Sequence, residues 1–163
     1  MNSGDPADSE DTWLRPITNE THIKRGAVHH GEFKKWLGPP DDAQKPWKLE
    51  FSGRLRSLVG SISQDANQKV EAQKAKLRAA NKPVPSAIKY CGILHSGVEH
   101  IREIADLDCD VIYEPTEDTA HANIVIKDKG AGEILTVTDI LLRHIKFLRE
   151  TEVANDPMFS SCV

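Results

Sequence analysis

Histidine and carboxylate side chains give this sequence its most obvious chemical potential. One of the seven histidines, His121, lies at the start of the apolar run 120–126, which follows the acidic loop 114–119, EPTEDT. A histidine close to Glu114, Glu117 or Asp118 could act as a general acid or base, because these side chains flank a single loop. The same pattern is equally typical of a polar turn whose carboxylates are solvated and whose histidine orders the loop.

A nucleophilic site is a second possibility, since Cys91, His95 and His121 could meet if their strands are neighbours. Cys91 lies within an apolar run, where a buried and unreactive thiol is usual. The sequence has no G-x-S-x-G motif, and no Cys/His spacing typical of a structural zinc module. His95 and His100 are five residues apart, not the four that put two ligands on one helix face. We predict no metal and no cofactor, and retain His121, Glu114 and His95 as candidate catalytic residues.

The segment 53–82 is basic, although the whole chain has a formal net charge of −4. A basic stretch of this kind is either a solvated helix face or a docking surface for an acidic partner. It contains no aromatic residue, so base stacking with nucleic acid finds no support. The predicted binding residues are Arg54, Arg56, Lys69, Lys74 and Arg78 of this segment, together with the aromatic residues Phe33, Trp36 and Trp47.

These residues require a framework, and the apolar pattern predicts an α+β fold with a small mixed sheet. Ser52 is the predicted N-cap of a long helix, and Ser96 with Glu99 forms a capping box before a short one. Strands are expected near 12–17, 47–51, 88–94, 109–113 and 120–126, and helices at 52–80, 97–105 and 137–152.

At 163 residues, the chain is long enough for one domain with a substantial core. We predict a disordered acidic tail at 1–11, a single domain at 12–154 and a flexible end at 155–163. The three cysteines include no Cys-x-x-Cys pair, which favours a reducing compartment. No apolar run reaches the roughly 18 residues of a membrane span, and the acidic N-terminus is unlike a signal peptide. We therefore predict a cytoplasmic protein that does not bind membranes.

Two motifs resemble those of small bacterial proteins with no assigned activity. The first is L-R-P-I…H-I…G-x-V…F, between Leu14 and Phe33, and the second is P…A-H-A-x-I, formed by Pro115 and residues 120–124. The resemblance implies an accessory component linked to bacterial defence, such as antiviral defence, or to signalling genes. It implies no named reaction and no catalytic residue.

Together these observations predict a non-enzymatic protein-binding or regulatory subunit whose partner is a protein with an acidic patch. One alternative is a small histidine-dependent hydrolase or nuclease centred on His121. A third possibility is a nucleic-acid-binding adaptor that uses the basic segment 53–82.

Overall fold

An antiparallel sheet forms the centre of the computed structural model, which describes residues 1–35, 37–38, 40 and 44–161. Its strands are β1 (Thr12–Asn19), β4 (Leu37–Gly38), β5 (Leu49–Leu55), β6 (Ile88–Gly97), β7 (Cys109–Tyr113), β8 (His121–Ile126) and β9 (Lys146–Arg149). Within the described residues, the strand order is β7-β8-β5-β1-β6-β9, and β4 also pairs with β5. Two further short strands, β2 (Ile23–Lys24) and β3 (Ala27–Val28), pair with each other.

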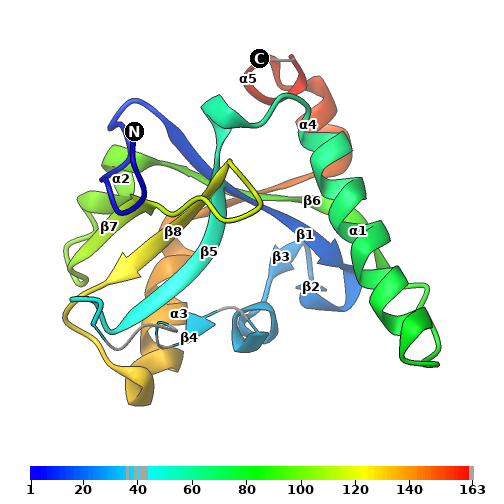
Figure 1. The fold of residues 1–163 in the computed structure, drawn as a ribbon, viewed down its shortest axis with the longest axis horizontal. Helices are drawn as coiled ribbons and strands as arrows, with labels where there is room; N and C mark the ends of the chain where they lie inside the picture. Colours follow the sequence, from blue (N-terminus) through cyan, green and yellow to red (C-terminus); the bar gives the residue numbers. More distant parts are fainter. Residues whose placement is uncertain (36, 39, 41–43, 162–163) are drawn as a thin grey trace.

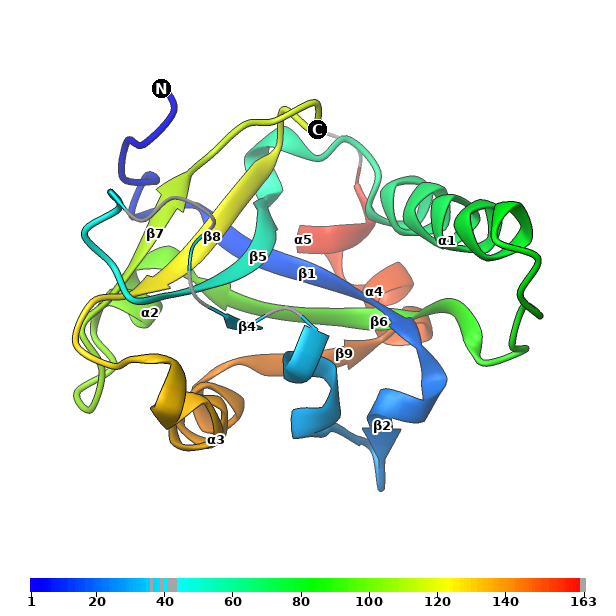
Figure 2. The same ribbon diagram turned by 60° about the horizontal axis from the view of Figure 1, so that its bottom comes forward.

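Helices cover both faces of the sheet (Figure 1). They are α1 (Ile62–Ala79), α2 (Val98–Arg102), α3 (Ile134–His144), α4 (Glu150–Asn155) and α5 (Pro157–Ser160), with 3₁₀ turns η1 (Glu20–His22), η2 (His30–Lys35), η3 (Arg56–Leu58) and η4 (Ala131–Glu133). Figure 2 shows α1 and α3 on opposite sides of the strands. No helix within the described residues is both long enough and apolar enough to cross a membrane.

The alternation of side chains along β1 explains how the sheet serves two hydrophobic clusters. Trp13 points into the larger cluster, which α2 and α3 cover and which also contains Phe51 and Ile124. Leu14, the next residue, points to the other face and packs with Ile62 at the start of α1 and with residues of α4 and α5. All of these side chains are buried, so β1 is held from both sides.

The predicted α+β class is confirmed, and each predicted strand has a counterpart in β1, β5, β6, β7 or β8. The prediction of a mixed sheet is wrong, because every neighbouring pair in this order is antiparallel. The long helix begins at Ile62, not near Ser52. Ser52 continues β5 and pairs with Asn123 of β8, and the side chain of Ser61 caps the helix by accepting from the Gln64 amide.

The C-terminal helix also differs from the predicted span 137–152. It ends at His144, and the chain then forms β9, which pairs with β6 and brings Phe147 opposite Leu94. Helical periodicity alone did not separate these elements, because apolar residues continue through the junction. The short helix is limited to Val98–Arg102 and has Gly97, rather than Ser96, at its N-cap.

Residues 1–11, predicted to be a disordered tail, lie along the outer edge of β7. The Ala7 amide donates to the Val111 carbonyl at 2.8 Å, and the Tyr113 amide donates to the Asp5 carbonyl at 2.9 Å. Arg102 donates to the Ala7 carbonyl at 2.6 Å. An edge strand offers unpaired backbone groups, and this segment satisfies them.

The C-terminal segment also differs from the predicted flexible end 155–163. Phe159 of α5 is buried, and its ring packs against the His95 ring with a centroid distance of 4.9 Å. Arg56 donates to the Met158 carbonyl at 3.0 Å and to the Ser161 carbonyl at 2.6 Å. The last part of the predicted span, 162–163, lies outside the described residues.

Candidate functional site

A cavity opens where β1 and β5 separate beneath α1. Among the described residues, these two strands pair at Trp13 with Leu55 and at Leu14 with Arg54. Beyond that point β1 continues beside β6, whereas β5 continues beside β8. The gap leaves a cavity of about 220 Å³ between the two strands and α1.

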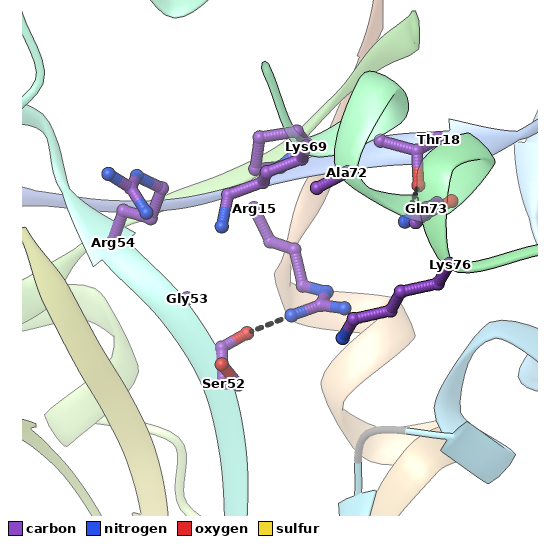
Figure 3. A pocket seen from close by; sticks show the side chains of 10 residues that line it. Arg15, Thr18, Ser52, Gly53, Arg54, Lys69, Ala72, Gln73 and Lys76 are labelled. Atoms are coloured by element: carbon purple, nitrogen blue, oxygen red, sulfur yellow. Dashed lines mark hydrogen bonds between the residues drawn. The ribbon is translucent and has the colours of Figure 1, made fainter. Parts of the chain in front are cut away.

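Positive charge dominates the lining of this cavity. Arg15 comes from β1, Arg54 from β5, and Lys69 and Lys76 from α1. Lys69 and Lys76 are seven residues apart and therefore lie on the same face of the helix. Figure 3 shows the four side chains around the cavity. Among the described residues that line it, none is acidic. We call this the cationic cavity.

Arg15 is held in place by the strand across the gap. Its Nη1 donates to the Ser52 carbonyl at 2.9 Å (Figure 3). Burial lowers the pKa of Arg15 well below its ordinary value, yet a guanidinium keeps its proton in proteins. A fixed positive charge therefore lies at the wall of the cavity.

Two carboxylates hold Arg54 from outside the cavity lining. Its Nη2 lies 2.8 Å from Asp65 Oδ1, and its Nη1 binds Asp118. Burial lowers the pKa of Arg54, and the charge of Asp65 opposes that shift. The pKa of Asp65 is raised by burial, against the influence of Arg54 and Lys69.

The positive charges around the cavity affect the pKa of Lys69. Its pKa is lowered first by burial and then by the positive charge of Arg54, while Asp65 opposes the shift and Arg15 adds to it. Its Nζ lies 3.7 Å from Asp118 Oδ2. The nearby carboxylates thus do not fully compensate the charge on this ammonium group.

We expect Lys69→Met to leave the free energy of unfolding at pH 7 unchanged or increased when no ligand is present. A lowered pKa means that the ammonium is less stable in the folded than in the unfolded chain at pH values below both pKa values, so losing the charge removes a penalty. For the same reason, the free energy of unfolding of the unsubstituted chain should rise as the pH rises from the lowered pKa of Lys69 in the folded chain to its ordinary pKa in the unfolded chain.

Urea unfolding tests this, with Lys24→Met at an exposed position of β2 as the control. If Lys69→Met lowered the free energy of unfolding while Lys24→Met did not, the Lys69 ammonium would stabilise the fold. Its place in the cavity would then not indicate a ligand.

Ser52 and His121 form a hydrogen-bonded pair beside the cationic cavity. Ser52 Oγ lies 2.8 Å from His121 Nε2, and His121 Nδ1 lies 2.7 Å from the Glu114 carbonyl oxygen. A carbonyl only accepts hydrogen bonds, so in the neutral ring Nδ1 carries the proton and Nε2 accepts from the Ser52 hydroxyl. This is the arrangement of a nucleophile and its general base. It also fastens the loop 114–119 to the sheet.

The carboxylate of Glu114 takes no part in that pair, which differs from the acid–base site predicted at this loop. It accepts from Asn123 Nδ2 at 2.6 Å and forms an ion pair with Lys45 Nζ at 3.0 Å. Glu114 therefore orients the His121 ring through its backbone, and its side chain is held by other groups.

Cys91, His95 and His121 could form a nucleophilic site only if their strands were neighbours, and they are not. Strands β1 and β5 lie between β6, which carries the first two residues, and β8, which carries His121. Burial raises the pKa of the Cys91 thiol to about 11, so it stays protonated and unreactive. His95 packs against Phe159, and burial lowers its pKa.

The predicted basic helix face does not exist as one surface. Arg54 belongs to β5 and Arg56 to η3, and both are buried. Arg56 donates hydrogen bonds to the carbonyl oxygens of residues 59, 158 and 161. Lys74 lies 3.7 Å from Glu71 on α1. Arg78 is exposed near the end of α1, whereas Lys69 lines the cationic cavity.

The predicted aromatic contacts are only partly described. Trp47 is buried with Ile112 and Val125, and its Nε1 donates to Glu50 Oε2 at 3.0 Å, so it belongs to the core. Trp36 and the side chain of Phe33 lie outside the part of the chain that the structure describes.

Sequence reasoning missed Arg15, Ser52 and Lys76. The available signals were an arginine inside the otherwise apolar segment of β1 and the seven-residue spacing of Lys69 and Lys76. Neither signal shows that β1 and β5 separate, which is what brings these residues together.

Histidines elsewhere do not assemble a metal site. His100 and His144 have ring centroids 5.6 Å apart. Across the described residues, however, no three His, Cys, Asp or Glu side chains are placed to hold a metal ion.

Comparisons with protein-family models, curated proteins and solved structures found no match for this chain. The resemblance to small bacterial proteins stays a prediction. Function is therefore inferred from the chemistry of the cationic cavity and the residues around it.

Proposed function

We propose that this chain is a binding protein whose cationic cavity takes an anionic group. The observation that supports this is the convergence of Arg15, Arg54, Lys69 and Lys76 on one cavity with no acidic residue among its described lining. The pKa of Lys69 is lowered first by burial and then by repulsion from Arg54 and Arg15. An anion in the cavity would replace repulsion with attraction.

A phosphate group suits this site better than a single carboxylate. It carries up to two negative charges and offers several terminal oxygens, which can be shared among donors from β1 and α1. Arginine and lysine are the usual side chains for phosphate recognition in proteins. A cavity of about 220 Å³ holds such a group while leaving it accessible to solvent.

The predicted role as a protein-binding or regulatory subunit remains a prediction, as do the cytoplasmic location and the link to bacterial defence. Because the cations line a cavity, an acidic protein partner would have to insert a side chain instead of docking a flat surface. Binding to nucleic acid is less favoured, since Arg54 and Arg56 are buried and unable to follow a phosphate backbone.

Calorimetric titration with pyrophosphate tests the proposal. We expect Lys69→Gln and Lys76→Gln each to weaken binding about tenfold, equivalent to ~1.4 kcal/mol, because each removes one charge from the cavity. Lys24→Gln removes an equal charge at an exposed residue that does not line the cavity, and it should bind like the unsubstituted chain. Absence of binding, or equal affinity in all three variants, would refute the cavity as an anion site.

Hydrolysis is a second candidate function, supported by the bond between Ser52 Oγ and His121 Nε2. A fluorophosphonate probe reports it. Ser52 Oγ would attack phosphorus, His121 Nε2 would take the hydroxyl proton, and fluoride would leave. We expect a covalent adduct on Ser52, formed at least about 100-fold more slowly in His121→Gln, which is within the usual contribution of a general base.

Ser57→Ala is the matched control, because the Ser57 hydroxyl is bound by the Asp11 carboxylate and has no histidine partner in the described structure. The rate at which the probe labels Ser52 should be unchanged in Ser57→Ala. If Ser52 is not labelled, or if His121→Gln is labelled at the normal rate, the pair serves only to fasten the loop 114–119.

A further inference from the structure

A second cavity of about 330 Å³ adjoins the cationic cavity along α1. The two cavities share Thr18, Gln73 and Lys76 as lining residues. In Figure 3 these three residues lie on the side of the cationic cavity away from Arg54. A ligand could therefore extend past Lys76 from one cavity into the other.

The second cavity has a different chemical character. Leu77 of α1 and Ile88 of β6 give it apolar walls, and Thr18, Asn19 and Gln73 add uncharged polar groups. Its cation, Lys76, lies where the two cavities meet. Its lining also contains Glu32, whose side chain is 1 % exposed and forms an ion pair with His22 Nδ1. His22, in the same lining, offsets the charge of this carboxylate. This space therefore suits an uncharged body with apolar and hydrogen-bonding parts.

We propose that the ligand is an organic phosphate monoester, with its phosphate in the cationic cavity and its uncharged body, such as a sugar or nucleoside, in the second cavity. This inference rests on the proposed function. Inorganic phosphate would fill only the first cavity. An acidic peptide that entered both cavities would place a second charged side chain against the apolar walls formed by Leu77 and Ile88, which is unfavourable.

Affinities measured by calorimetry for inorganic phosphate, phenyl phosphate, ribose 5-phosphate and adenosine 5′-monophosphate test the proposal. At least one organic phosphate should bind ten times more tightly than inorganic phosphate. Leu77→Trp should fill the second cavity, remove this preference and leave the affinity for inorganic phosphate unchanged. Ala75→Trp, at an exposed position of α1 outside both cavities, should retain the preference.

Ile88→Trp fills the second cavity from the opposite wall and replaces Leu77→Trp if that variant does not fold. The inference is overturned if no organic phosphate exceeds inorganic phosphate, if filling the cavity leaves the preference intact, or if a polyglutamate peptide binds more tightly than every organic phosphate. Failure of the proposed function is distinct, because then inorganic phosphate itself would not bind in a Lys69-dependent manner.

Discussion

Replacing Arg54 with methionine is expected to lower the free energy of unfolding by about 3 kcal/mol or more. The Arg54 side chain is 10 % exposed and binds Asp65, which is 14 % exposed, together with Asp118. Removing the guanidinium leaves the Asp65 carboxylate without its closest cation in a site where burial already raises its pKa. An unpaired buried charge is among the most destabilising changes that one substitution can make.

The double variant Arg54→Met with Asp65→Leu provides the control. Replacing both charges with apolar groups removes the unpaired carboxylate, so much of the lost stability should return. Urea unfolding of the single and double variants makes the comparison. If Arg54→Met costs less than about 1 kcal/mol, as is usual for an exposed ion pair, this pair does not hold β5 against α1.

Gly53→Ala is expected to cost about 3 kcal/mol, because β5 approaches the Trp13 ring too closely for a side chain. A Cβ at Gly53 would overlap the indole atoms of Trp13. That ring is fully buried, packs 5.1 Å from the centroid of Phe51, and donates from Nε1 to the Ala122 carbonyl at 3.2 Å. Moving the ring disturbs the packing and that hydrogen bond together.

Gly60→Ala is the matched control, since nothing lies within 4 Å of the added Cβ. It should change the free energy of unfolding by less than about 0.5 kcal/mol, as is usual for surface substitutions. In a Trp13→Phe background, Gly53→Ala should cost less than in the natural chain, because phenylalanine lacks the second ring of the indole. An unchanged cost in that background would place the strain elsewhere.

Local pattern predicted the elements of this fold better than their ends. The apolar runs at 88–94 and 120–126 correspond to β6 and β8, since alternating or continuous apolar residues favour strands in most contexts. The start of α1 was missed because residues 52–55 also suit a strand, and only pairing with β8 decides between the two. β9 and the N-terminal segment depend likewise on sheet edges that the sequence does not display.

The site was less predictable than the fold. Lys69 and His121 were candidates from the sequence. Arg15, which lines the cavity with Lys69, and Ser52, which is hydrogen-bonded to His121, come from strands remote in the chain. The proximity of His121 and Glu114 was foreseeable, because a short loop joins them. The sequence could not show that Glu114 binds His121 through its backbone carbonyl, because this contact depends on how the loop folds over the sheet.

The most direct test of the cationic cavity is an NMR titration of the ¹⁵N-labelled chain with pyrophosphate. We expect saturable changes in the backbone amide shifts of Thr18, Gly53, Lys69 and Lys76, which belong to three different elements and share only the cavity. Lys69→Gln should weaken these changes together. Changes confined to the exposed end of α1 near Arg78, or no saturable change at all, would contradict the account.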